Sequence, residues 1–207
     1  MTVLYEVGDN LYVNLTNKCS NNCDFCTRNN CNGYGDANDL WLHGHEPTVE
    51  EVKALFDQRN MSRYREVVFC GFGEPTERVE DVAELARYIK EKYGKATRIN
   101  TNGQSDLING RPTAHLFAGV MDTVNVSLNT CSADKYDAEC HSIFGKEAFE
   151  ALIRYAVDCS KYVGKVVFSV VDVIPPEDIE QCRRIAEENG IGFRVRKYID
   201  NGERTQQ

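Results

Sequence analysis

The chain has 207 residues, a formal net charge of −8, 42% hydrophobic residues and 27% charged residues. This composition is ordinary for a globular protein, and the length predicts a single domain over residues 1–207 with its own core. No apolar run approaches the roughly 20 residues of a membrane-spanning helix, so no membrane contact is expected. The acidic charge disfavours nucleic-acid binding, which depends on many contacts between basic side chains and phosphates.

The N-terminal part of the chain begins with a predicted β-hairpin. Residues 4–16 alternate between apolar and polar side chains, and Gly8-Asp9-Asn10 supplies the turn. A polar segment over residues 27–46 is rich in Asn and Gly. A loop of this length in a compact domain is usually functional. Thr48, with Glu51 three residues later, then predicts the N-cap of a helix.

Strands and helices alternate over the rest of the chain. About six strand–helix units are expected, which predicts right-handed crossovers and a parallel sheet. Six units are fewer than the eight of a closed TIM barrel, so the predicted fold is α/β, an open partial (β/α)6 barrel. The predicted strands are 67–70, 97–100, 123–128, 166–173 and 192–198. A first helix is predicted to open at Pro47-Thr48, and the later predicted helices are 79–93, 114–117, 133–140, 146–160 and 176–189.

Three cysteines, Cys19, Cys23 and Cys26, follow the first hairpin in a C-x3-C-x2-C pattern. Three thiolates can surround one metal centre, and a centre that needs four ligands then keeps one position for other chemistry. Cys31 follows closely, so C-x3-C-x2-C-x4-C can also form a four-thiolate zinc site or a ferredoxin-like cluster. The alternative function is therefore a non-catalytic protein, structural or electron-transferring, with Cys31 as the fourth ligand.

The cysteine count argues against a disulfide framework. The chain has nine cysteines, an odd number, and no secretory signal segment follows Met1. A reducing cytoplasm is therefore the expected compartment. We expect Cys70, Cys159 and Cys182 to be buried without a chemical role, because they lie in strand or helix patterns.

A second motif, Gly71-Phe72-Gly73-Glu74-Pro75, follows a predicted strand. Glycines at a strand end let a ligand approach the backbone, and the carboxylate can accept hydrogen bonds from an ammonium group. A simple tight turn is the alternative. The carboxyl ends of parallel strands share one end of a barrel, so we expect this turn, the cysteine loop, Asn102 and Asn129 to lie together.

The cysteine motif, with Phe25 before its third cysteine, resembles that of the radical S-adenosylmethionine (radical SAM) superfamily. Over nearly the whole chain the sequence is most similar to the TatD-associated radical SAM proteins. The resemblance implies an open partial barrel in which Cys19, Cys23 and Cys26 hold three irons of a [4Fe–4S] cluster and S-adenosylmethionine chelates the fourth.

The resemblance also implies the residues that bind the cofactor. The GFGEP turn resembles the Gly-Gly-Glu-Pro motif that holds the methionine amino group, although Phe72 replaces a glycine and puts backbone contact there in question. Phe25, Val170, Val171 and Val173 would by the same resemblance pack around the adenine, and core packing is their alternative. Polar capping of strand ends is the alternative for Asn102, Ser127 and Asn129. The implied cofactor-binding residues are Phe25, Gly71, Gly73, Glu74, Asn102, Ser127 and Asn129.

The reaction implied by the resemblance is reductive cleavage of S-adenosylmethionine to methionine and a 5′-deoxyadenosyl radical, which abstracts hydrogen from an unidentified substrate. The expected reductant is a flavodoxin or ferredoxin, and the subfamily name implies a link to a TatD-type metal-dependent hydrolase. The catalytic residue is unknown, with Cys131 at the barrel mouth as a weak candidate. We expect His43 and His45 to face solvent. The chain ends at Gln207, soon after the last strand, so a small substrate or a covering partner protein is expected.

Overall fold

The computed structural model describes residues 2–198. One sheet carries seven strands in the order of the chain. The first two strands pair antiparallel and form the predicted hairpin, and every later pair is parallel. The strands are β1 Leu4–Val7, β2 Asn10–Val13, β3 Glu66–Phe69, β4 Ala96–Thr101, β5 Thr123–Ser127, β6 Lys165–Val171 and β7 Gly192–Arg196.

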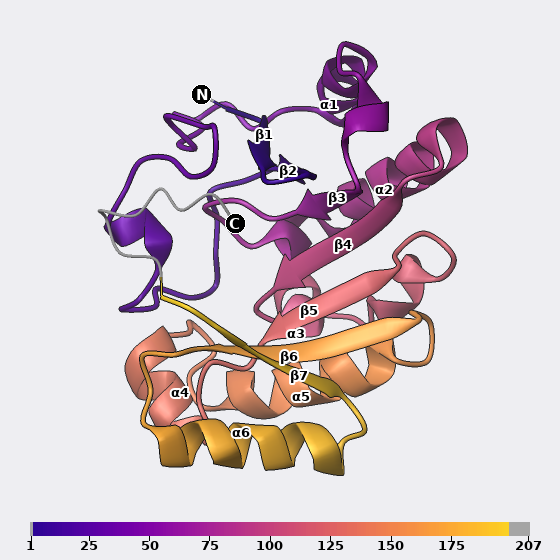
Figure 1. The fold of residues 1–207 in the computed structure, drawn as a ribbon. Coiled ribbons are helices and arrows are strands. Elements are labelled where there is room, and N and C mark those ends of the chain that lie inside the picture. The colour runs from indigo at the N-terminus through magenta and orange to yellow at the C-terminus, as the bar shows by residue number, and fades with distance from the viewer. Residues whose placement is uncertain (1, 199–207) are drawn as a thin grey trace.

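The crossovers between parallel strands contain α-helices and short 3-10 helices (η). In Figure 1, α2 and α5 lie behind the strands, α6 runs along the bottom, and the carboxyl ends of β6 and β7 lie at the left, toward α4. The helices are η1 Thr27–Asn29, α1 Val49–Asp57, η2 Met61–Arg63, η3 Pro75–Arg78, α2 Val79–Tyr93, α3 Ser105–Asn109, η4 Ala114–Phe117, α4 Ala133–Cys140, α5 Glu147–Cys159 and α6 Pro176–Glu188.

The sheet is curved but not closed, since β1 and β7 have one strand neighbour each. Strands β2 to β7 form six parallel strands, which confirms the predicted open partial (β/α)6 barrel. The described residues contain no helix that is long and apolar enough to cross a membrane.

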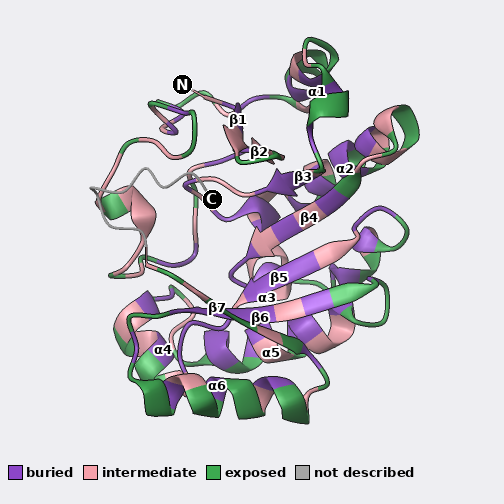
Figure 2. Ribbon diagram, in the orientation of Figure 1, coloured by how far each residue is buried: buried purple, intermediate pink, exposed green. Residues whose placement is uncertain are grey.

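The main core lies between the sheet and its helices. Alternate strand residues enter this core, so Leu11, Val67, Ile99, Val124 and Phe168 are fully buried in it. Figure 2 shows the same division, with buried residues along the strands and exposed residues on the outward side of α6. The other strand residues face the inside of the partial barrel.

Local signals in the sequence explain where several helices begin and end. Thr48 caps α1 as predicted: its hydroxyl accepts a hydrogen bond from the Glu51 amide, and the Glu51 carboxylate accepts one from the Thr48 amide. Helix α2 has the predicted bounds, and Gly94 ends it in the left-handed conformation.

Some predicted elements were misplaced. The sequence pattern missed α3, a single short helix with one buried residue. Strand β6 ends at Val171, so Val173 is outside the sheet, is 46% exposed and is not part of the core. Strand β7 ends at Arg196 rather than at residue 198, and the Tyr198 amide instead donates to the Asp172 carboxylate.

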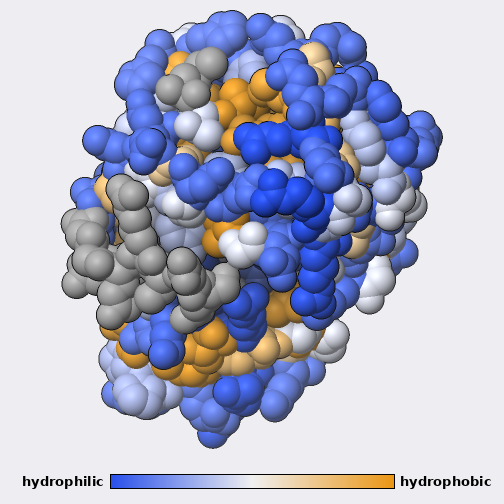
Figure 3. All heavy atoms as spheres, turned by 45° about the horizontal axis from the view of Figure 1, so that its top comes forward, coloured by the Kyte–Doolittle hydropathy of each residue, from blue (hydrophilic) through white to orange (hydrophobic). Residues whose placement is uncertain are grey.

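The long segment 27–46 folds over the inside of the barrel and has a small core of its own. Tyr5, Ala37, Leu40 and Phe72 are its buried members. The segment reaches the far edge of the sheet, where the Asn30 amide donates to the Tyr198 hydroxyl at 2.5 Å. In Figure 3 the visible surface is mainly hydrophilic, and apolar residues show as small patches between polar ones.

We expect Ile99→Ala to reduce the free energy of unfolding of the cluster-free protein by about 2–5 kcal/mol, because the change leaves a cavity in the main core. Urea denaturation followed by circular dichroism measures this change. The matched control is Val195→Ala on β7, whose side chain is 40% exposed; it should cost less than about 1 kcal/mol. Equal losses in the two variants would contradict the proposed location of the core.

Candidate functional site

The cysteine loop lies at the carboxyl end of the strands and is held there by backbone hydrogen bonds to the segment that ends α4. The amide of Asn22 donates to the carbonyl of Cys140 at 2.9 Å. The amide of Ile143 donates to the carbonyl of Ser20, also at 2.9 Å. The loop is therefore fixed by a segment more than a hundred residues away in the chain.

The side chain of Gln104 is the centre of a buried polar network under the cysteine loop. Its amide oxygen accepts hydrogen bonds from the hydroxyls of Ser20 and Ser142, each at 2.8 Å. Its amide nitrogen donates to the Asn21 side-chain oxygen at 2.8 Å and to the Tyr136 hydroxyl at 3.0 Å. All five residues are buried. Gln104 thus uses its whole amide to join the cysteine loop, the end of β4 and the α4 region.

The GFGEP turn lies directly against the start of the cysteine loop. A Cβ atom at Gly73 would overlap the carbonyl oxygens of Thr16 and Lys18, and one at Gly71 would overlap the side chain of Asn14. The Glu74 amide donates to the Lys18 carbonyl at 2.8 Å. The two glycines therefore permit a close backbone approach between the two predicted motifs.

The carboxylate of Glu74 is buried and accepts four hydrogen bonds. The donors are the amide and the hydroxyl of Thr76, the hydroxyl of Thr101 and the amide of Asn102, at 2.7–3.0 Å. Burial raises the pKa of Glu74, and these donors oppose that shift. The carboxylate thus joins the end of β3 to the end of β4.

The side chain of Phe72 points into the small core under segment 27–46. It packs edge-on against Trp41, with the ring centroids 5.3 Å apart. Its carbonyl oxygen accepts a hydrogen bond from the Arg28 guanidinium, which also donates to the Asn21 carbonyl at 3.1 Å. The departure from glycine at this position is therefore accommodated by the long loop of this chain.

The three motif cysteines are partly exposed and their thiols lie in different environments. Burial, with the Glu74 charge second, raises the pKa of Cys19 to about 12. Burial also raises the pKa of Cys26. Hydrogen bonding from the Cys140 thiol lowers the pKa of Cys23. The positive charge of Arg28 favours the thiolate form of all three.

Asn102 and Asn129 are two of the polar residues predicted at the strand ends. They differ in whether their side-chain oxygen has a hydrogen-bond partner. The Asn102 amide donates to the Ser20 hydroxyl and accepts from the Gln104 backbone. Asn129 is buried in the left-handed conformation, and its side-chain oxygen has no hydrogen-bond partner among the described residues. A buried acceptor without a partner is costly.

No side-chain hydrogen bond within residues 2–198 assigns a role to two other predicted cofactor-binding residues. Ser127 ends β5 and is partly exposed. Phe25 is partly buried against the main core. Val170 and Val171 are buried. Their contribution to a cofactor pocket stays a prediction.

Cys31, the fourth ligand of the alternative function, is partly exposed. Its thiol donates to the Thr27 carbonyl at 3.4 Å and packs against the small core under segment 27–46. Within residues 2–198, no three His, Cys, Asp or Glu side chains are arranged to hold a single metal ion.

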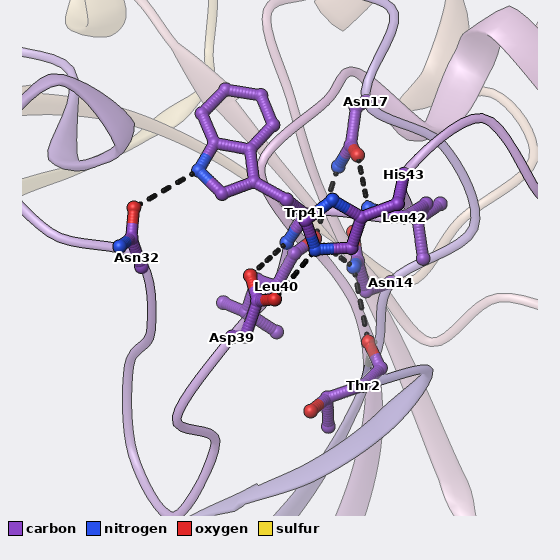
Figure 4. A network of polar contacts seen from close by, with 9 residues as sticks. All are labelled: Thr2, Asn14, Asn17, Asn32, Asp39, Leu40, Trp41, Leu42 and His43. Atoms are coloured by element: carbon purple, nitrogen blue, oxygen red, sulfur yellow. Dashed lines mark hydrogen bonds and ion pairs between the residues drawn. The ribbon is translucent and has the colours of Figure 1, made fainter.

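The two histidines of the long loop are exposed and each contacts a carboxylate. His43 lies 2.7 Å from Asp39, and His45 lies 3.6 Å from Glu51. Figure 4 shows His43 beside Asp39, in a network that Asn14 and Asn17 anchor to the strand end. Both histidines therefore make surface contacts with carboxylates and face solvent, as predicted.

The remaining cysteines only partly match expectation. Cys159 and Cys182 are buried, as predicted, but Cys70 is partly exposed because it follows β3 on the inside of the barrel. Cys131, the weak catalytic candidate, lies beside the carboxylate of Asp178, and burial raises the pKa of its thiol. Within residues 2–198, no hydrogen bond or ion pair joins Cys131 to the cysteine loop.

Sequence reasoning missed four residues that shape the site: Asn21, Arg28, Gln104 and Cys140. Asn21 and Arg28 lie in or next to the cysteine motif, so their proximity was a usable signal. Gln104 and Cys140 gave no local signal, because their partners are distant in the sequence. Gln104 binds Asn21, which is 83 residues away, and Cys140 contacts Cys23 of the cysteine loop.

We expect Gln104→Leu to lower the free energy of unfolding by about 2 kcal/mol or more, because buried polar partners lose their hydrogen bonds. Alkylation of the motif cysteines in the cluster-free protein should also become faster. Gln104→Glu should be intermediate, since a carboxylate can accept from Ser20 and Ser142 but cannot donate. The surface variant Gln181→Leu is the control, and the Gln104 network would be unimportant if Gln104→Leu behaved like it.

Solved radical SAM proteins share the fold of this chain. SuiB of Streptococcus suis bound to S-adenosylmethionine matches with a TM-score of 0.65 at 18% identity, over 96% of this chain and 41% of SuiB. A radical SAM methyltransferase from Sphaerobacter thermophilus matches with a TM-score of 0.64 at 16% identity, over 94% and 68% of the two chains. Methylornithine synthase (PylB) matches with a TM-score of 0.63 at 16% identity, over 96% and 57%.

Two curated proteins are related in sequence. A "Probable GTP 3′,8-cyclase" of Thermococcus kodakarensis is 32% identical over 157 residues, which are 76% of this chain and 45% of that protein. A "Probable GTP 3′,8-cyclase" of Methanocaldococcus jannaschii is 28% identical over 179 residues, 84% of this chain and 55% of that protein. The chain therefore spans about half the length of the curated relatives it matches.

The family model of the Radical SAM superfamily matches residues 13–188, a range that contains the cysteine motif, the GFGEP turn and four of the six parallel strands in full. The match covers most of the sequence and agrees with the structural likeness. The chain belongs to the radical SAM superfamily.

Proposed function

We propose that Cys19, Cys23 and Cys26 each bind one iron of a [4Fe–4S] cluster and that S-adenosylmethionine binds at the fourth iron. The chain is a radical SAM enzyme, and the cluster and S-adenosylmethionine are the cofactors of this superfamily. The observation that carries the residue assignment is the direct packing of the GFGEP turn on the cysteine loop through Gly73, Thr16 and Lys18.

The residues present fit this pair of cofactors. Three partly exposed thiols lie on one loop at the carboxyl end of the sheet, and thiolates are the usual ligands of iron–sulfur clusters. Because each thiolate would bind a different iron, the three sulfur atoms do not have to converge on one ion. The orphaned side-chain oxygen of Asn129 is a buried acceptor that a ligand donor, such as a ribose hydroxyl, would satisfy.

The buried carboxylate of Glu74 has a positioning role in this proposal. Its four hydrogen bonds fix the turn, so the backbone of Gly71 and Gly73 is left to approach the methionine amino group. Asn102 similarly holds Ser20 of the cysteine loop. Phe25, Ser127 and Asn129 would contact the adenosine or carboxylate part of the cofactor.

When bound and reduced by one electron, these cofactors supply a 5′-deoxyadenosyl radical that abstracts hydrogen from a substrate. The reductant must be strong, near the low end of the roughly −700 to +450 mV range of iron–sulfur clusters, so a flavodoxin or ferredoxin is proposed. The protein supplies position and excludes water. Residues 1–207 would form one such catalytic core.

GTP is the first substrate to test, because two curated relatives are named as probable GTP 3′,8-cyclases. The narrower resemblance to TatD-associated proteins stays a prediction, as does a link to a TatD-type hydrolase. The alternative function, a four-thiolate cluster or zinc protein completed by Cys31, is disfavoured by the packing of Cys31 into the small core beside segment 27–46.

Anaerobic reconstitution should yield about four irons per chain, and dithionite reduction should give an EPR signal that changes when S-adenosylmethionine is added. Incubation should then release 5′-deoxyadenosine, measured by chromatography. The expected change follows from direct binding at the fourth iron. A signal indifferent to S-adenosylmethionine, or bound zinc in place of iron, would refute the enzyme mechanism proposed for this site.

Single Cys→Ser variants separate the two ligand sets. Replacing Cys19, Cys23 or Cys26 should remove most of the cluster, measured as iron per chain and as loss of the EPR signal. The matched control is Cys31→Ser, five residues past the last motif cysteine, which should keep the full cluster. Loss of the cluster in Cys31→Ser, with folding intact by circular dichroism, would favour the four-thiolate alternative.

A further inference from the structure

The inside of the partial barrel is polar, in contrast to its helix-covered face. Along neighbouring strands the register places polar side chains side by side on this face, toward the viewer in Figure 1. The Asn125 amide, for example, donates to the Ser169 hydroxyl at 3.1 Å. The polar or charged strand residues of this face are Tyr5, Asn10, Tyr12, Glu66, Arg98, Asn100, Thr123, Asn125, Ser127, Lys165, Ser169, Arg194 and Arg196.

One of the inward-facing arginines, Arg98, is already neutralised. Its guanidinium contacts a single carboxylate oxygen of Glu66 through Nε at 3.1 Å and through Nη2 at 2.9 Å. Its remaining donor, Nη1, reaches the side-chain oxygen of Asn100 at 2.9 Å. Arg98 therefore carries no unsatisfied positive charge into the barrel.

Arg196 is different, because none of its contacts within the described residues is with a carboxylate. It is the last residue of β7, beside Val171 of β6, and its backbone carbonyl accepts a hydrogen bond from the Asp172 amide. The Nε atom is buried and has no hydrogen-bond partner in residues 2–198. The charge is thus held in place without a counter-ion from the described chain.

The ionisable groups with the largest electrostatic effect on Arg196 are neutral or positive. They are the phenols of Tyr12 and Tyr34, the thiol of Cys70 and the guanidinium of Arg194. Burial raises the pKa of Tyr12, Tyr34 and Cys70, so these three remain protonated near neutral pH. Two phenol hydroxyls beside an unpaired guanidinium form a set of donors that matches the oxygens of an anion.

Arg196 is partly buried, and burying an unpaired charged group costs free energy, so native proteins normally pair such groups. We propose that Arg196, together with Tyr12 and Tyr34, binds the carboxylate or phosphoryl oxygens of the substrate inside the barrel. This inference rests on the proposed function, and it names the substrate class as anionic. Segment 27–46, which carries Tyr34 and contacts Tyr198 through Asn30, covers the same side of the barrel.

The test measures binding of two probe anions to the reconstituted protein loaded with S-adenosylmethionine, by anaerobic calorimetry. Pyrophosphate represents a phosphoryl group and succinate a carboxylate. The wild type should bind at least one of them, and Arg196→Gln should weaken that binding roughly tenfold or more, as expected for loss of a charge-assisted contact. Arg196→Lys should lose less, because it keeps the charge.

Arg184→Gln is the matched control, since Arg184 is exposed on α6 and is not part of the inner face of the sheet. It should bind the probes like the wild type. Circular dichroism and the melting temperature of Arg196→Gln establish that the variant is folded, and Arg196→Lys provides the comparison if it is not. The probe that binds the wild type more tightly identifies the phosphoryl or the carboxylate class.

Three results would overturn the proposal. The wild type could bind neither probe, folded Arg196→Gln could bind them as tightly as the wild type, or Arg196→Gln could lose affinity for S-adenosylmethionine by the same factor. The last result would assign Arg196 to the cofactor. Failure of the proposed function is a separate observation: no 5′-deoxyadenosine would form, while Arg196-dependent anion binding would persist.

Discussion

The buried amide of Gln104 is the interaction on which the position of the cysteine loop depends. The loop has no regular secondary structure of its own, and its sequence is mainly polar. It is held by hydrogen bonds, of which Gln104 makes the central ones to Ser20 and Asn21. Buried polar networks of this kind specify one arrangement when every member is satisfied. Three ligands for a cluster need such a fixed arrangement, because their sulfur atoms must face different irons at the same time.

The close approach at Gly73 adds a second constraint, which links the two motifs. The cysteine loop and the GFGEP turn follow different strands, but their backbones touch at Lys18 and Glu74. A side chain at Gly73 would separate them, whereas Phe72 can be large because it points into the small core of segment 27–46. Gly73 must therefore be small because the cysteine loop fills the space beside it. Its neighbour Phe72 can be large because the core of segment 27–46 accommodates its ring.

The sequence predicted the features that depend on local signals. The hairpin, the capped start of α1, the exact span of α2 and the six-strand count all follow from turn residues, caps and periodicity. The ends of β6 and β7 were placed too late, because apolar residues such as Val173 continue past the pairing. The Gln104 network and the contact between Cys23 and Cys140 could not be predicted, since they are formed only when distant segments pack together.

The two faces of the sheet differ in polarity and, we infer, in role. The helix-covered face is apolar and supplies stability, so its residues could be selected for packing alone. The inner face carries charges and amides that weaken a core, and most of them satisfy one another, as Arg98 and Glu66 do. Arg196 does not have such a partner among the described residues, and its charge is retained on the face that the cysteine loop and segment 27–46 border. An unpaired guanidinium on this face costs folding free energy, and the anionic ligand that we propose would offset that cost by pairing with it.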